Sequence, residues 1–259
     1  MKKTALITGA SSGLGVEFAR IHASKGDNLV LVARSTDKMK VLKAELIKEF
    51  GISVHVIGKN LTSQTAVREI FDELKAKKIK IDYLINNAGF GDFGTFAQCD
   101  WDKQSDMISL NVMSLTYLTR LFLPEMIKNK YGKIMNVAST AAFQPGPTMS
   151  VYFATKAFVL SFTEAIANEL KGTGVTATAL CPGATNTGFK INASLDNSNL
   201  FKGNQIATSK EVAEFGYKAM MKGKTVVIYG LMNRIMAASV RFAPRNVVAA
   251  IAKMKMRAK

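Results

Sequence analysis

The chain has 259 residues, of which 48% are hydrophobic and 21% are charged. This composition is typical of a globular protein with a substantial buried core and excludes a disordered chain. The net charge of +16 raises the question of nucleic-acid or membrane partners. No acidic residue follows Glu214, however, so the positive excess belongs largely to the C-terminal end.

Targeting and membrane-spanning segments are not expected. The apolar stretch near the N-terminus is too short for a signal peptide and leads directly into a glycine-rich turn. No apolar run reaches the roughly 18 residues that a spanning helix needs. Cys99 and Cys181 lie far apart and form no CxxC pair, which argues against a disulfide framework or a metal knuckle. We therefore expect a cytoplasmic protein in a reducing compartment.

Short apolar runs rich in β-formers alternate with helical patterns. The expected strands cover residues 4–8, 28–33, 53–58, 82–86, 132–138, 175–181 and 225–229. Near-continuous apolar strands separated by helices indicate a doubly wound α/β (Rossmann) fold, with a seven-stranded parallel sheet covered by helices on both faces. No linker interrupts residues 1–229, which we assign to one domain. Residues 230–259 form a basic amphipathic helical tail, either part of that domain or appended to it.

The first strand runs into a glycine-rich turn that precedes a helix. Glycines let the backbone turn sharply and approach a ligand, and the N–H groups at the helix start attract a pyrophosphate. Such a turn alone is a weak signal. Its G-x-x-x-G-x-G spacing resembles that of the short-chain dehydrogenase/reductase family. The candidate cofactor-binding residues of this turn are Gly9, Ser11, Ser12, Gly13, Leu14 and Gly15.

The end of the second strand bears on the choice of coenzyme. An acidic residue there would bind the ribose 2′-hydroxyl and repel a 2′-phosphate. Ala33 stands where NAD-preferring family members carry Asp, and the next residue, Arg34, can pair with a phosphate in bidentate fashion. The sequence therefore favours NADP(H). The alternative is that Arg34 only faces solvent.

The ends of the third and fourth strands also correspond to positions of the family pattern. After the third strand the family usually has Asp and an apolar residue that read the adenine. Here Asn60 and Leu61 take these places, and an Asn oxygen can still accept a hydrogen bond from the adenine amino group. The fourth strand matches the family's NNAG element, which stabilises the sheet and borders the cofactor, with Asn86, Asn87, Ala88 and Gly89.

Tyr152 and Lys156 are four residues apart on a helix expected over residues 151–171, so they share one face. A free tyrosine has a pKa of about 10, and a nearby ammonium would lower that pKa toward the range a general acid/base requires. Alone, the pair is common by chance, and a surface Tyr beside a solvated Lys is the alternative. The family's catalytic tetrad is matched in order and approximate spacing by Asn111, Ser139, Tyr152 and Lys156.

The sixth strand is followed by further family positions. Pro182 and Gly183 come first, and Thr185 and Thr187 follow, with Thr187 at the family's threonine position. With these, the resemblance covers residues 4 to about 230. We include all four, together with Tyr152 and Lys156, among the cofactor contacts.

The resemblance implies an NADP(H)-dependent oxidoreductase that transfers a hydride between nicotinamide and a carbonyl or alcohol. It also implies that residues 1–229 form a dinucleotide-binding and catalytic domain. Ser139 would hold the substrate oxygen, and Tyr152 would exchange its proton. Lys156 would bind the nicotinamide ribose and lower the Tyr152 pKa, and Asn111 would anchor a water. No metal is required, and relatives usually form homodimers or homotetramers. The alternative is a non-catalytic NADP(H)-binding sensor or scaffold, against which the complete tetrad argues.

Residues 183–208 are rich in Asn, Ser, Thr and Gly, which suggests a flap over substrate or a plain surface excursion. Aromatic and methionine residues in the segments after the strands suggest apolar pocket walls and an apolar ketoacyl, steroid-like or other carbonyl substrate. These residues are Phe90, Phe93, Phe96, Phe143, Met149 and Phe189. The alternative is that the aromatic residues only pack in the core.

The tail contains two helical patterns, over residues 231–242 and 245–256, separated by Pro244. Apolar residues alternate with basic ones, so each helix should have an apolar and a cationic face. The tail could be a lid or subunit contact beside the pocket, or a peripheral membrane-surface element. Nucleic acid is the weakest of these options, and we expect no nucleic-acid partner. His22, near the core face of a helix, is expected to be structural.

Overall fold

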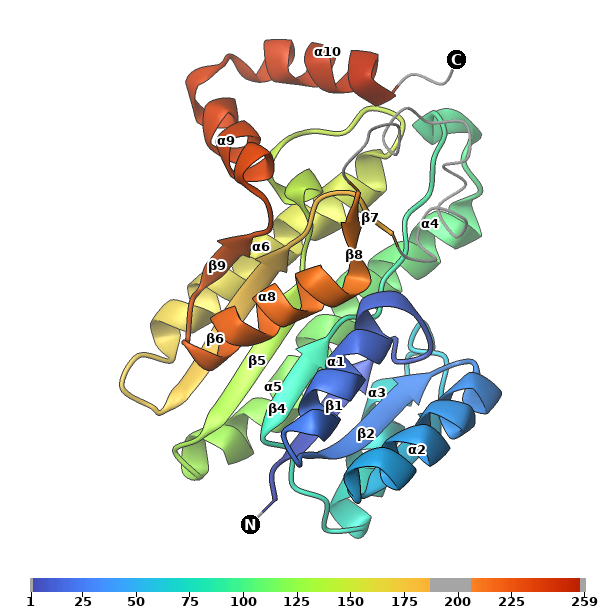
Figure 1. The fold of residues 1–259 in the computed structure, drawn as a ribbon. Coiled ribbons are helices and arrows are strands. Elements are labelled where there is room, and N and C mark those ends of the chain that lie inside the picture. The colour runs from blue at the N-terminus through green and yellow to red at the C-terminus, as the bar shows by residue number, and fades with distance from the viewer. Residues whose placement is uncertain (1, 187–205, 257–259) are drawn as a thin grey trace.

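The strands of the computed structural model form one parallel sheet, in the order β3-β2-β1-β4-β5-β6-β9 (Figure 1). The structure describes residues 2–186 and 206–256. The sheet confirms the seven predicted strands, which end within one residue of their predicted limits. They are β1 (Thr4–Thr8), β2 (Asn28–Ala33), β3 (Val54–Gly58), β4 (Tyr83–Asn86), β5 (Gly132–Val137), β6 (Val175–Cys181) and β9 (Val226–Ile228).

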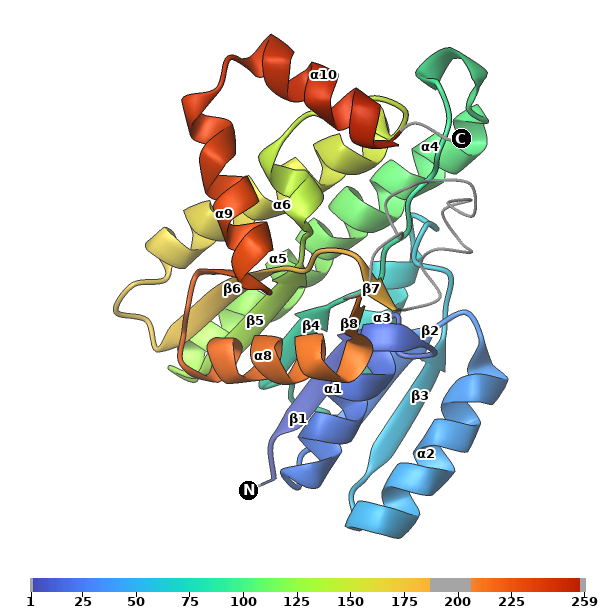
Figure 2. The same cartoon turned by 45° about the horizontal axis from the view of Figure 1, so that its top comes forward.

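Helices cover both faces of this sheet, as predicted (Figure 1). One face carries α1 (Gly13–Ser24), α2 (Thr36–Phe50) and α8 (Ser209–Met221). The other carries α3 (Ala66–Ala76), α4 (Trp101–Ile108), α5 (Leu115–Lys128) and α6 (Ser150–Glu169). The tail forms α9 (Leu231–Ser239) and α10 (Arg245–Met256), which lie at the end of the molecule opposite the N-terminus (Figure 2).

Shorter elements connect these layers. A π-helical segment, Ser109–Ser114, joins α4 to α5, and 3-10 turns occupy Phe96–Gln98, Thr140–Phe143 and Val240–Phe242. A small parallel pair, β7 (Thr185–Asn186) and β8 (Ala207–Thr208), was not predicted. It brings together the two described ends of the segment proposed as a flap. The rest of that segment lies outside the described residues.

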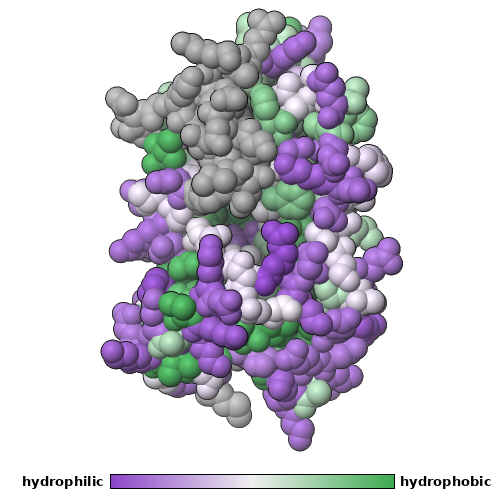
Figure 3. Space-filling model, turned by 90° about the vertical axis from the view of Figure 1, so that its right-hand side faces the viewer, coloured by the Kyte–Doolittle hydropathy of each residue, from purple (hydrophilic) through white to green (hydrophobic). Residues whose placement is uncertain are grey.

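The sheet is buried on both sides because its strands are almost entirely apolar. Successive side chains of a strand point to opposite faces. In β1, Ile7 packs into the cluster beneath α1, α2 and α8, whereas Leu6 packs into the cluster with α3, α5 and α6. By contrast, hydrophilic side chains cover much of the side that carries the β3 edge of the sheet (Figure 3).

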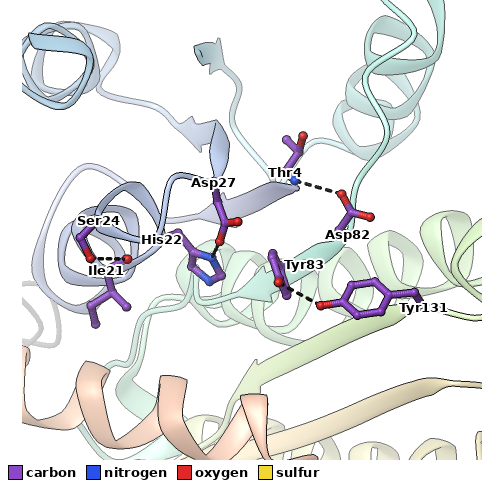
Figure 4. A network of polar contacts seen from close by, with 8 residues as sticks. All are labelled: Thr4, Ile21, His22, Ser24, Asp27, Asp82, Tyr83 and Tyr131. Atoms are coloured by element: carbon purple, nitrogen blue, oxygen red, sulfur yellow. Dashed lines mark hydrogen bonds and ion pairs between the residues drawn. The ribbon is translucent and has the colours of Figure 1, made fainter. Parts of the chain in front are cut away.

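His22 belongs to a buried polar network near the amino ends of the central strands (Figure 4). Its Nδ1 atom lies 2.8 Å from Oδ2 of Asp27, and its ring centre lies 4.8 Å from that of Tyr83. The Tyr131 hydroxyl donates a hydrogen bond of 2.9 Å to the Tyr83 hydroxyl. His22 is therefore buried near the core, in the kind of position that its predicted structural role requires.

Candidate active site

The loops that follow strands β1 to β6 meet at one edge of the sheet and enclose a cavity of about 840 Å³. Ligands of open α/β sheets bind at this edge. Most of the predicted site residues line the cavity, namely Gly9, Ser11, Ser12, Gly13, Leu14, Arg34, Asn60, Leu61, Asn87, Ala88, Gly89, Ser139, Tyr152, Lys156, Pro182, Gly183 and Thr185. Gly15 and Asn111 lie behind its wall. Thr187 lies outside the described residues.

The glycine-rich turn is folded tightly against the start of α1. Gly9 has a φ of +66°, a conformation that favours glycine. A Cβ on Gly15 would lie 2.2 Å from the Gly9 carbonyl oxygen, so a side chain at Gly15 would force the turn open. The turn therefore leaves its backbone close to the cavity, as the phosphates of a dinucleotide require.

Hydrogen bonds tie this turn to the loop after β4. The Thr8 hydroxyl accepts from the backbone N–H groups of Asn87 and Ala88, both at 3.0 Å. The Asn87 side chain also donates, from Nδ2, a hydrogen bond of 2.9 Å to the carbonyl oxygen of Thr8. Behind them, Asn86 Nδ2 donates to Asn136 Oδ1 at 2.9 Å, which links β4 to β5. The NNAG element thus joins the two loops that border the cavity.

Arg34, Asn60 and Leu61 line one end of the cavity. The Arg34 side chain is exposed there, whereas the nearby Lys59 ammonium is paired with Glu69. The Asn60 side-chain oxygen accepts a hydrogen bond of 3.3 Å from the Thr62 N–H and retains a second lone pair. This end of the cavity therefore offers a cation and a hydrogen-bond acceptor.

Tyr152 and Ser139 form a hydrogen-bonded pair at the other end. Tyr152 is in the first turn of α6, and Ser139 lies two residues after the end of β5. Burial raises the pKa of the Tyr152 phenol to about 12, although the hydrogen bond with Ser139 acts in the opposite direction. The sequence led us to expect a lowered pKa, and this expectation was wrong because residue spacing does not reveal burial. At neutral pH the phenol holds its proton.

Lys156 lies one helical turn beyond Tyr152. Its Nζ atom is 5.8 Å from the centre of the Tyr152 ring and donates a hydrogen bond of 2.8 Å to the Val137 carbonyl oxygen. Burial lowers the pKa of this ammonium to about 8. The two side chains therefore share one face of α6, as their spacing predicted, and both are buried.

Asn111 is positioned by the π-helical segment, which the sequence did not reveal. Its Nδ2 atom donates to the Phe90 carbonyl oxygen at 3.0 Å and to Thr155 Oγ1 at 3.1 Å. A Cβ on Gly89 would lie 2.9 Å from Asn111 Oδ1 and 3.3 Å from Lys156 Nζ. Asn111 and Lys156 therefore converge on the same glycine, although they come from different helices.

The C-terminal tail supplies much of the remaining cavity wall. Ala252 and Met256 of α10 are buried and belong to one apolar cluster with Tyr152 and Phe153. Val248 of the same helix is also buried and lines the cavity. On α9, the cavity is lined by residues that include Asn233, Met236 and Ala237. The sequence raised a lid as one option for the tail. Its prediction of one apolar and one cationic face for each helix was wrong, because Leu231 and Ile235 of α9 are exposed whereas Ala237 is buried.

The predicted apolar wall is confirmed in part. Phe90, Phe143 and Met149 line the cavity, and Phe93 packs against the cluster around Tyr152. The prediction that Phe96 lines the pocket was wrong, because this residue is 61% exposed on a 3-10 turn. Phe189 lies outside the described residues.

Comparison with known proteins identifies the family. The model of the short chain dehydrogenases matches residues 3–198. A ketoacyl reductase, HetN, of a Nostoc species is 34% identical over 227 residues, which is 87% of this chain and 78% of that protein. The very-long-chain 3-oxoacyl-CoA reductase of Anas platyrhynchos is 31% identical over 69% of this chain. The match covers only 58% of that enzyme.

A solved structure agrees with these matches. A short-chain dehydrogenase from Sphingobium yanoikuyae, in complex with NADPH, has a TM-score of 0.83 and 31% identity, with 93% of each chain covered. The chain therefore belongs to the short-chain dehydrogenase/reductase family of oxidoreductases.

Proposed function

We propose that this protein is an NADP(H)-dependent reductase of apolar carbonyl compounds, with 3-oxoacyl thioesters as the favoured class. The observation that carries the proposal is the buried, hydrogen-bonded pair of Tyr152 and Ser139, with Lys156 beside it, at the end of a cavity with apolar walls. A protonated phenol in this position suits the reduction of a carbonyl, which consumes a proton.

The cavity fits a dinucleotide. The backbone of the glycine-rich turn lies at the cavity without intervening side chains at its glycines. Arg34 and Asn60 lie at one end of the cavity, where they would bind the 2′-phosphate of the adenosine and the adenine. The loops after β4 and β6 border the other end, and we include Thr187 with the latter. When bound, the coenzyme would supply the hydride.

The chain's own groups perform the proton chemistry in this proposal. The Ser139 hydroxyl holds the substrate oxygen, and Tyr152 donates its proton to that oxygen as the carbonyl becomes an alcohol. Lys156 holds the nicotinamide ribose and, with Asn111, lies on the route by which Tyr152 regains a proton. We also propose that residues 1–229 form one domain and that the protein is a homodimer or homotetramer. Exposed Trp101 on α4 and Phe158 on α6 support such self-association.

The substrate class rests on the tail and on the relatives. Both relatives are named for the reduction of ketoacyl or oxoacyl groups, and the tail lines the cavity with apolar side chains. A sensor or scaffold without turnover stays the alternative, and an activity assay separates the two.

The direct test is NADPH oxidation with 3-oxoacyl thioesters of increasing acyl length, alongside steroid ketones and short aldehydes. Each methylene that enters the cavity should raise kcat/KM about three- to fourfold until the apolar wall is filled. A flat response to chain length would contradict the substrate class. Tight NADPH binding without turnover of any compound would establish the sensor alternative.

Replacing Arg34 with alanine tests the coenzyme assignment. Loss of a charge-assisted contact with the 2′-phosphate should raise the KM for NADPH about ten- to hundredfold and leave the KM for NADH nearly unchanged. Steady-state kinetics with both coenzymes measure this ratio. Arg68→Ala, at an exposed arginine on α3, is the matched control and should change neither. Equal effects of Arg34→Ala on both coenzymes would refute the assignment.

A further inference from the structure

Helix α9 has apolar side chains on two opposite faces. The inner face, which includes Met236 and the buried Ala237, lines the cavity. The outer face carries Leu231, Ile235 and, in the 3-10 turn that follows the helix, Phe242, at positions i, i+4 and i+11. These three side chains are 71%, 53% and 89% exposed. The outer face is therefore a line of large apolar groups in contact with solvent.

Helix α10 repeats this arrangement. Val248, Ala252 and Met256 recur every fourth residue, are buried and line the cavity. Val247 and Met254 lie on the opposite side of the helix and are 44% and 62% exposed. The apolar residues of the tail are thus more numerous than its packing against the sheet domain requires. Apolar patches of this kind on a protein surface mark interaction sites.

Basic side chains accompany both outer faces. Arg234, Arg241, Arg245 and Lys253 are exposed along the tail. The sequence after Glu214 contains no aspartate or glutamate, so no acidic side chain of the tail balances them. The outer surface of the tail is therefore both apolar and cationic.

A surface that is both apolar and cationic favours one kind of binding partner over others. A second copy docked on the same surface would bring these cations against their own equivalents. Nucleic acid would pair with the cationic side chains but would leave the exposed apolar side chains in contact with water. An anionic bilayer satisfies both, because apolar groups enter the boundary between headgroups and acyl chains while Lys and Arg contact the phosphates.

We propose that the outer faces of α9 and α10 bind the surface of an anionic phospholipid bilayer. Within the described residues no helix is long and apolar enough to cross a membrane, so the helices would lie in the plane of the interface. Both views place α9 and α10 at one end of the molecule, away from the sheet (Figures 1 and 2). The protein can therefore rest on a bilayer without disturbing the fold.

Co-sedimentation of the full chain with vesicles tests the proposal without any requirement for turnover. Vesicles of phosphatidylcholine mixed with phosphatidylglycerol should sediment the protein, and vesicles of phosphatidylcholine alone should retain much less of it. Replacing two arginines, in Arg234→Gln/Arg241→Gln, should weaken binding to the anionic vesicles about 30-fold. The triple variant Leu231→Ser/Ile235→Ser/Phe242→Ser should abolish it.

The matched control replaces exposed apolar residues elsewhere. Val41 and Ile47 of α2 are 61% and 39% exposed, so Val41→Ser/Ile47→Ser removes similar groups from another face and should bind like the wild type. Failure of the wild type to bind anionic vesicles, or equal binding by the triple variant, would overturn the proposal. Light scattering in solution identifies the competing case, in which the triple variant loses a self-assembled form and the wild type binds no vesicles.

Discussion

The Tyr152→Phe variant should lose at least about a hundredfold in kcat and keep its affinity for NADPH. General acid catalysis contributes on the order of 10²- to 10⁴-fold to a rate, and phenylalanine preserves the ring while removing the proton. The ring is buried beside Phe153, so the variant retains the packing of the wild type. Its loss of activity would therefore report on the hydroxyl alone.

Two measurements check this result. Steady-state kinetics give kcat, and titration of NADPH fluorescence gives the dissociation constant. Tyr131→Phe is the matched control, because that hydroxyl bonds to Tyr83 in the network at the other end of the sheet. It should leave kcat unchanged. Residual activity of Tyr152→Phe above a few per cent of wild type would contradict the proton-transfer role.

Replacing Lys156 with methionine should abolish activity and weaken NADPH binding, and yet raise the melting temperature. Methionine fills similar space without the ammonium that burial disfavours. Burial lowers the pKa of Lys156 from 10.5 to about 8. Between these two pH values the unfolded chain binds a proton that the folded chain has lost, so wild-type stability rises with pH across this window. Below pH 8 the folded protein bears the cost of a buried charge.

Thermal melts from pH 7 to pH 10.5 would test this prediction. The difference in melting temperature between Lys156→Met and wild type should be largest below pH 8 and shrink as the pH approaches 10.5. A lower melting temperature for the variant at pH 7 would show that Lys156 stabilises the fold. Unchanged NADPH affinity would argue against contact between Lys156 and the ribose.

The sequence predicted the sheet well because its strands are buried on both faces. A run such as residues 28–33 is nearly all apolar, and no helix of that length would bury every side chain. The tetrad was found by its order and spacing, and the structure brings Ser139, Tyr152 and Lys156 to one cavity. These features are local patterns that a parallel sheet brings to the same edge.

The features that were missed depend on packing between distant segments. The π-helical segment around Asn111 adds no recognisable residue type, so periodicity could not predict it. The inward face of the tail is defined by its contacts with α6, and the raised pKa of Tyr152 by the depth of its burial. Phe96 was misplaced because an aromatic residue near a site carries no indication of its direction.

The hydroxyl of Thr8 has a practical implication for protein engineering. It accepts hydrogen bonds from the backbone N–H groups of Asn87 and Ala88, which begin the loop after β4. The side-chain amide of Asn87 donates hydrogen bonds to the backbone carbonyl oxygens of Thr8 and Gly9. Substitutions in the two loops should therefore be strongly epistatic, since residues that share partners deviate from additivity. Libraries designed to remodel the glycine-rich turn would have to vary residues 8–15 and 86–89 together, because improvements selected separately should fail when combined.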